Sequence, residues 1–99
     1  MLIYEVTAIV DGELTAAYER YMVEQHIPDL LATGHIQAAF FAKTGLQYKM
    51  GYHADSQKQL DMYLADHAER LRADLKDHFP TGIEFSRQVF EIVKLFPSL

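Results

Sequence analysis

The side chains best suited to proton-transfer chemistry in this sequence are Glu5, Lys49 and His53. A carboxylate beside a lysine or a histidine can hold or move a proton where water is excluded. Each of the three lies in a stretch of alternating polar and apolar residues, which is typical of a β-strand. We therefore expect all three on one face of a sheet, where they form either a proton-transfer site or a structural ion pair inside a subunit interface.

Gln37 and His26 are two further polar residues whose positions suggest a role in binding. Gln37 belongs to another strand-like stretch and is expected on the same face as Glu5. His26 lies at the end of a predicted helix, directly before Ile27 and Pro28, where a cation meets the negative end of the helix dipole. It is either a capping residue that holds the turn or a general base at the mouth of a cavity. The candidate ligand-binding residues are therefore Glu5, Gln37, Lys49, His53 and His26, and none of them is assigned to a catalytic step.

The elements that position these side chains follow from the spacing of apolar residues. Alternation marks four strands, and steps of three and four mark two helices, the second opening with a capping box at Ser56 and Gln59. Pro28 is expected to disturb the first helix and open a short helical turn, because the residue before a proline avoids the α region. The predicted elements are a strand at Leu2–Val10, a helix from Glu13 to about His26, strands at His35–Lys43 and Leu46–Ala54, a helix from Ser56 to about His78, and a strand at about Glu84–Leu95.

This β-α-β-β-α-β order predicts a single ferredoxin-like α+β domain over residues 1–99, with the split βαβ arrangement. Right-handed connections give a four-stranded antiparallel sheet with both helices on one face. The first strand is largely apolar on both of its faces, which is typical of a strand in the middle of a sheet. We expect the first and third strands to be central.

The face of the sheet that the helices leave open is expected to meet a second copy of the chain. It mixes polar and apolar side chains, and it is too apolar for a solvated face and too polar for a core. Pairing two such faces across a twofold axis would enclose a cavity suited to a small ligand. The alternation in the last strand is too even to assign Arg87 to a face. The expected open-face residues are Ile3, Glu5, Thr7, His35, Gln37, Ala39, Phe41, Gln47, Lys49, Gly51 and His53.

Several short motifs resemble those of a known superfamily. They are Ile3-Tyr4-Glu5-Val6, His26-Ile27-Pro28 with Ala32-Thr33-Gly34, Tyr52, and Tyr63-Leu64 with His67-Ala68 and Leu71-Arg72. With these motifs the chain resembles the dimeric α/β-barrel superfamily, which includes antibiotic-biosynthesis monooxygenase-like, EthD-like and YciI-like proteins. It is similar, more narrowly, to a small bacterial family of unknown function within that superfamily. The resemblance implies two sheets back to back in a homodimer, but the fold selects no activity. The family pattern places a glutamine before Tyr52, where this chain has Gly51.

Composition argues against several classes of function. The absence of cysteine excludes disulfides and thiol chemistry. A net charge of −5 without a basic block argues against nucleic acid as a partner. No apolar run approaches the roughly 20 residues of a membrane span, and no secretory signal is visible, so we expect a cytoplasmic protein without a membrane partner. The histidines lack metal-ligand spacing and the glycines form no phosphate loop, so neither a metal nor another cofactor is expected.

Three functions fit these residues. The first is a homodimeric protein that binds a small apolar ligand in a cavity between the sheet faces. The second is a cofactor-independent enzyme, similar to a monooxygenase or an isomerase, that acts on a small apolar or aromatic substrate. The third is an interaction module whose sheet face is only a dimer contact. We favour the binding protein, because the open face is of ligand size and carries no recognisable catalytic triad.

Overall fold

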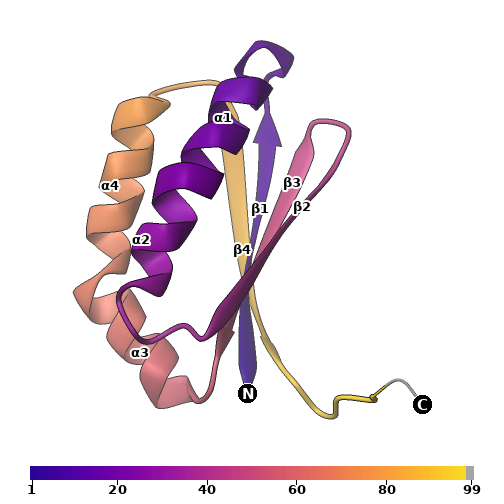
Figure 1. Cartoon of the computed structure of the whole chain (residues 1–99), viewed down its shortest axis with the longest axis vertical. Coiled ribbons are helices and arrows are strands. Elements are labelled where there is room, and N and C mark those ends of the chain that lie inside the picture. Colours follow the sequence, from indigo (N-terminus) through magenta and orange to yellow (C-terminus); the bar gives the residue numbers. More distant parts are fainter. Residues whose placement is uncertain (98–99) are drawn as a thin grey trace.

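The computed structural model describes residues 1–97 and has the predicted ferredoxin-like α+β fold (Figure 1). One antiparallel sheet of four strands forms a layer, and all the helices pack on one side of it. The sheet is open and does not close into a barrel. No helix among the described residues is long and apolar enough to cross a membrane. The elements are β1 (Leu2–Val10), α1 (Thr15–Tyr21), α2 (Ile27–Leu31), β2 (Ala38–Thr44), β3 (Gln47–Ala54), α3 (Gln57–Asp66), α4 (Ala68–His78) and β4 (Ile83–Glu91).

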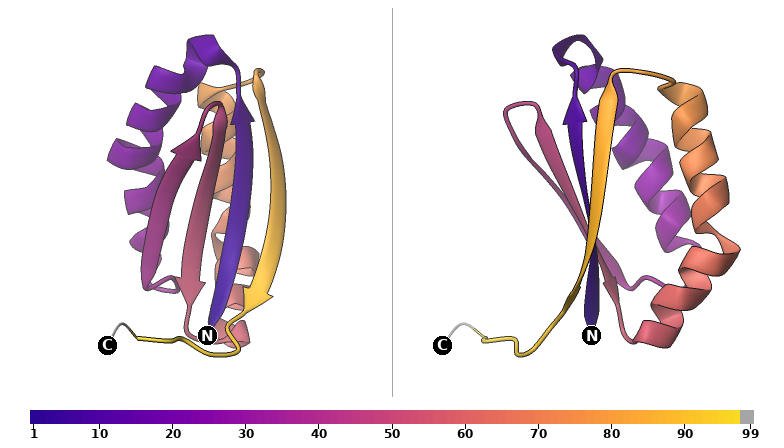
Figure 2. Two further views of the ribbon diagram at one scale, coloured as in Figure 1. Left: turned by 90° about the vertical axis from the view of Figure 1, so that its right-hand side faces the viewer. Right: turned by 180° about the vertical axis from the view of Figure 1, so that it is seen from behind.

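The strand order in the sheet is β2-β3-β1-β4, so β1 and β3 are the central strands, as predicted (Figure 2). The register between β1 and its two neighbours places Glu5 beside Gly51 of β3 on one side and Gln88 of β4 on the other. The left view of Figure 2 shows the open face of this sheet with the helices behind it. One face of the sheet therefore packs against the helices, and the other is left uncovered within a single chain.

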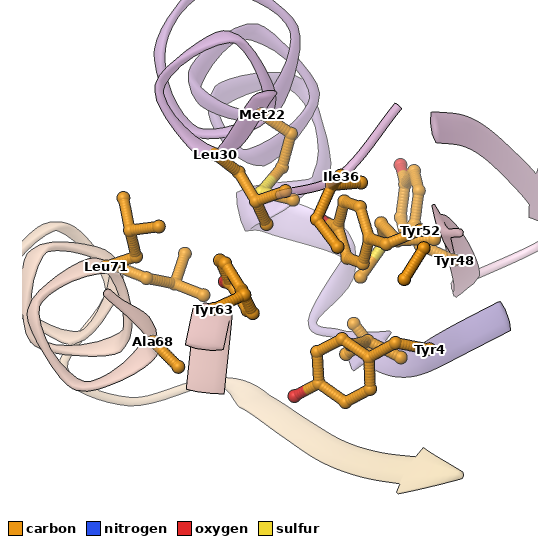
Figure 3. Packing of buried hydrophobic residues seen from close by; sticks show 14 of the residues in the cluster. Tyr4, Met22, Leu30, Ile36, Tyr48, Tyr52, Tyr63, Ala68 and Leu71 are labelled. Atoms are coloured by element: carbon orange, nitrogen blue, oxygen red, sulfur yellow. The ribbon is translucent and has the colours of Figure 1, made fainter. Parts of the chain in front are cut away.

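The core lies between the sheet and the helices. Every second side chain of β1 is buried from Leu2 to Val10, and on β3 the side chains of Tyr48, Met50 and Tyr52 are buried in the same layer. Figure 3 shows how aromatic and aliphatic side chains from the sheet and from the helices meet in this layer. Full burial of an apolar side chain of this size contributes about 1.5–3 kcal/mol. The faces predicted for β1 and β3 are confirmed.

The face assignment predicted for β2 is wrong by one residue. The strand begins at Ala38 rather than His35, and its register pairs Phe40 with Gly51 and Phe41 with Met50. Phe41 packs on the helix side, with its ring 5.4 Å from that of Tyr48. Phe40 lies on the open face, where the missing side chain of Gly51 leaves room for its ring. A Cβ atom at position 51 would lie only 2.0 Å from Cε2 of Phe40.

The short helical turn predicted to open at Pro28 is present as α2, but the chain does not leave the helical conformation before it. The chain stays helical from α1 through a π-helical turn at Met22–His26 into α2, and Pro28 lies within the first turn of α2. The amide of Ile27 donates to the carbonyl of Met22, five residues earlier, where an α-helix would use the residue four earlier. A proline lacks an amide hydrogen and crowds the carbonyl four residues before it.

The second helix is divided at His67 into α3 and α4. The amide of Gln59 donates to Oγ of Ser56 over 3.2 Å, so the predicted cap is present. At His67 the backbone leaves the helical region with φ at −131°. Its ring lies 5.5 Å from that of His35, whose Nδ1 atom is 2.7 Å from Oε1 of Gln59. These side chains join the bend to the segment that leads into β2.

The last strand is shorter than predicted. It ends at Glu91, and the amide of Ile92 donates to the carbonyl of Met1 over 2.9 Å. The chain from 93 to 97 then extends away from the domain, at the end marked C in Figure 1. Val93 in this segment is 96 % exposed.

The contact between Phe40 and Gly51 predicts a coupled pair of substitutions. Gly51→Ala should destabilise the wild-type fold by about 1 kcal/mol, because the new methyl group displaces a packed aromatic ring. In a Phe40→Ala background the same substitution should stabilise the fold by about 0.5–1 kcal/mol, because alanine loses less backbone freedom than glycine. Urea denaturation of the four proteins at one fixed concentration gives the coupling free energy.

Gly12→Ala is the matched control, because the nearest heavy atom to its Cβ would be 3.9 Å away, on Leu46. Its effect should be the same with and without Phe40. Additive effects of Gly51→Ala and Phe40→Ala would contradict the proposed packing of the ring over position 51.

A candidate ligand site between the helices and the sheet

His26 is buried between the helices and the sheet, with only 7 % of its surface exposed. Its Nδ1 atom has no hydrogen-bond partner among the described residues. Burial lowers the pKa of this imidazole to about 4, although the carboxylates of Asp29 and Asp74 act in the opposite direction. His26 is therefore neutral at pH 7, and a ring nitrogen is available to bond to a molecule in the space beside it.

The π-helical turn at Met22–His26 is the local feature that holds this side chain. It puts one additional residue into the turn, and both Met22 and His26 are buried in it. Turns of this kind occur often at functional sites. The same motif, His26-Ile27-Pro28, was singled out by the sequence, which predicted a helix end there. The structure instead turns the histidine into the interior of the domain.

A small cavity adjoins His26 on the helix side of the sheet. Its volume is about 30 Å³, which is enough for one or two water molecules. The walls are mostly apolar, and the polar groups around it come from both layers: His26, Tyr4, Tyr52, Tyr63, Arg72 and Arg87. Burial raises the pKa of the Tyr63 phenol to about 12 and also raises that of Tyr52. Both phenols therefore keep their protons and can donate hydrogen bonds at pH 7.

A larger groove between α4 and β4 leads away from this cavity. It has a volume of about 240 Å³ and shares Arg72, Leu75, Phe85 and Arg87 with the cavity. Nη2 of Arg72 donates to the hydroxyl of Tyr4 over 2.8 Å, and the guanidinium of Arg87 lies 5.6 Å from the centre of the Phe85 ring. The two arginines thus line both the groove and the cavity beside the buried histidine.

Three of the five residues predicted for the site lie on the open face of the sheet. Nζ of Lys49 is 3.0 Å from Oε1 of Glu5 and also donates to Oγ1 of Thr7 over 3.4 Å. Glu5 pairs across the ladder with Gly51, so Lys49 and His53 are its two diagonal neighbours on β3, and the carboxylate pairs with Lys49. The Lys49 side chain is 45 % exposed, and an ion pair this exposed contributes at most about 1 kcal/mol.

The other two predicted residues do not join this group. Gln37 precedes β2 with an exposed side chain, and its amide donates to the carbonyl of His53. The register of β2 begins only at Ala38, and Ile36 before it is buried in the core, so the alternation of the strand does not extend to Gln37 and its place on the open face stays a prediction. His26 lies on the opposite side of the sheet from Glu5, Lys49 and His53. The structure therefore contains two separate polar groups where the sequence predicted one.

Residues 1–93 of the chain match the model of a domain of unknown function, DUF4286. The chain belongs to this family. The resemblance drawn from its short motifs, to a family of unknown function, is thereby confirmed. No curated protein matches this DUF4286 chain by sequence.

Solved structures similar to the DUF4286 chain share its fold at very low sequence identity. A dimeric ferredoxin-like protein from an uncultured marine organism has a TM-score of 0.73 at 11 % identity, and the alignment covers 98 % of each chain. A proposed antibiotic biosynthesis monooxygenase from Nitrosomonas europaea has a TM-score of 0.74 at 9 % identity and covers 95 % of this chain and 100 % of its own. An EthD family protein from Bacillus halodurans has a TM-score of 0.71 at 10 % identity and covers 94 % and 100 %. Likeness at this identity shows the fold alone.

The polar groups around the cavity of the DUF4286 chain were missed by the sequence analysis, which assigned the tyrosines to packing. The sequence did contain a signal for Arg87, because Ile83, Phe85, Arg87 and Val89 are every second residue of β4 and share one face of it. An arginine among apolar side chains indicates the edge of the core or a binding site, because a charged group is costly to bury without a partner. Arg72 carried a weaker signal, since it directly follows Leu71 in a helix whose leucines face the core.

The lowered pKa of His26 predicts a specific dependence of stability on pH. The pKa of His26 is about 4 in the folded chain and 6.5 in the unfolded chain, so between these pH values the imidazole is protonated only in the unfolded chain. Stability is therefore lost as the pH falls from about 6.5 towards 4, by about 2–3 kcal/mol at pH 4.5. His26→Leu lacks this contribution. Urea unfolding at pH 7.5 and 4.5 should show the variant gaining that amount relative to wild type.

Nuclear magnetic resonance gives an independent readout of the same group. The His26 ring signals of the wild-type protein should titrate with a midpoint near pH 4. A midpoint at or above pH 6 would contradict a buried, neutral imidazole.

Proposed function

We propose that this protein is a homodimer that binds a small molecule. In this proposal the open face of the sheet forms the contact between two copies, and the ligand occupies the His26 cavity together with the adjoining groove. The observation that carries the proposal is the buried imidazole: its Nδ1 atom has no partner among the described residues, and its side chain lines a cavity that shares wall residues with the groove between α4 and β4. Buried polar atoms are nearly always satisfied, so an unsatisfied one beside a cavity indicates a missing bonding partner.

The case for a dimer rests on the open face. Phe40 and Phe90 on this face are 42 % and 44 % exposed, although both belong to the sheet. Aromatic side chains concentrated on one face favour a protein contact. The Glu5–Lys49 pair lies among them and would become less exposed in such a contact. A structural neighbour is described as a dimeric ferredoxin-like protein, which supports self-association of this chain.

The ligand is assigned to the helix side rather than to a chamber between two sheets. On the open face the Phe40 ring fills the space over Gly51, and Glu5 is engaged by Lys49. On the helix side a cavity and a groove exist within a single chain. The groove is smaller than the roughly 300–1,000 Å³ of a pocket for a drug-sized molecule, which favours a small ligand with an apolar body.

Binding fits the buried histidine better than catalysis by a cofactor-independent enzyme. A general base works best when its pKa is close to the operating pH. A pKa of about 4 places His26 about three units below neutrality, which leaves a weak base. The same neutral ring is well suited to exchange a hydrogen bond with a ligand.

The proposed dimer predicts the mass of the protein in solution. Sedimentation equilibrium at micromolar concentration should give twice the 11.4 kDa of one chain. Phe90→Lys places a charge on the open face and should shift the protein towards the monomer, because burying an unpaired charge is costly. Val23→Lys is the matched control, since Val23 is exposed on the helix side. A wild-type protein that stays at the mass of one chain would overturn the proposed dimer.

The proposed ligand position predicts which variants lose binding. A panel of small uncharged aromatic and aliphatic compounds should contain some that raise the melting temperature, and a ligand at 100 times its Kd adds about 2.7 kcal/mol. Leu75→Phe should abolish the shift, because Leu75 lines both the cavity and the groove. Lys49→Gln and His53→Gln should retain it. The reverse pattern would place the ligand between the sheets, and a panel without any stabilising compound would count against a binding protein.

A further inference from the structure

The groove between α4 and β4 is positively charged in an acidic protein. The chain has 14 acidic and nine basic residues, yet Arg72, Lys76 and Arg87 line the groove and no acidic residue does. Side chains of one sign that converge on a concave surface raise the local concentration of ions of the other sign. The local charge is thus opposite to that of the whole molecule.

These three cations have no carboxylate partner in the described part of the chain. The ion pairs there are Glu19–Lys43 and Glu5–Lys49, which lie elsewhere. Arg72 donates one hydrogen bond to the hydroxyl of Tyr4, and Arg87 lies against the Phe85 ring. An arginine has five N–H donors, so most of the donors of both guanidinium groups remain available to a ligand.

The remaining walls of the groove are apolar. They are formed by Leu75, Phe79, Pro80, Ile83 and Phe85. An inorganic anion would leave these walls in contact with water, whereas an anion with an apolar body covers them. Guanidinium groups bind the two oxygens of a carboxylate through paired hydrogen bonds. The volume of about 240 Å³ suits a body no larger than a single ring or a short chain.

We infer that the ligand is a small carboxylic acid whose carboxylate lies between Arg72 and Arg87 and whose apolar body lies against Phe79 and Phe85. This inference rests on the proposed function and deepens it. The two arginines line both the groove and the cavity beside His26. A ligand bound there by its carboxylate places its polar end against the wall residues that the groove shares with the His26 cavity.

The test compares benzoate with benzamide, which has nearly the same shape and no charge. Benzoate is titrated at pH 7 into the isotope-labelled wild-type protein and followed by nuclear magnetic resonance. It should cause saturable chemical-shift changes at Phe79, Ile83 and Arg87. The affinity for benzamide and for inorganic phosphate should be at least tenfold lower. Raising the salt concentration should lower the affinity for benzoate and leave the affinity for benzamide unchanged.

Variants assign this difference to the groove. Arg87→Gln and Lys76→Gln should each reduce the affinity for benzoate, Arg87→Gln by tenfold or more, without changing that for benzamide. Arg70→Gln is the matched control, because Arg70 is exposed on the same helix and does not line the groove. The variants should unfold within a few degrees of wild type.

Several results would overturn the inference. Equal affinities for benzoate and benzamide, or an unchanged benzoate affinity in Arg87→Gln, would show that the site does not select a carboxylate. If phosphate bound as tightly as benzoate, the apolar walls would contribute nothing to the affinity. If benzoate caused no saturable chemical-shift changes, the groove would not be a binding site for small carboxylic acids. The uncharged panel and Leu75→Phe test the proposed binding function separately, so failure of the carboxylate inference can be distinguished from failure of the proposed function.

Discussion

Burial of one face of β1 beneath the helices is the constraint on which the rest of the structure depends. The side chains at Leu2, Tyr4, Val6, Ala8 and Val10 all enter the core, so those between them must leave it. Because β1 pairs with both β3 and β4, it imposes the same division on its two neighbours. The separation of a helix side with a cavity from an open side with an ion pair follows from this single alternation.

The faces of β1 and β3 could be predicted because the polar residues of each strand, such as Glu5 and Thr7 or Lys49 and His53, fall in only one of its two alternating sets. The face of β2 could not, since alanines and phenylalanines occupy both of its alternating sets from Ala38 to Ala42. Its orientation is decided by space on the neighbouring strand, where Gly51 admits the ring of Phe40. That information is not local to β2. The division of the second helix at His67 is equally non-local, since that ring meets His35 from a distant part of the chain.

Half of the candidate site was within reach of the sequence. Strand parity alone places Glu5 and Lys49 on one face, and the structure brings their charged atoms to 3.0 Å. The burial of His26 could not be predicted, because His26 was expected at the end of the first helix, whereas the helix widens there into a π turn and continues into α2. Arg72 and Arg87 come together only because α4 packs beside β4, and no local spacing reports that contact. Whether the open faces of two copies enclose a chamber stays a prediction.

The π-helical turn has a consequence for the history of the chain. In an α-helix each residue advances by about 100° around the axis, so one extra residue in a regular helix would rotate every later side chain by that angle. The π-helical turn at Met22–His26 takes up such a residue within a single turn. Side chains before and after the turn can therefore keep their direction towards the sheet, and Tyr18 of α1 and Leu30 of α2 are both buried in the core. A chain that lost one residue here would return to a regular α-helical turn without rotating the helix faces on either side of it.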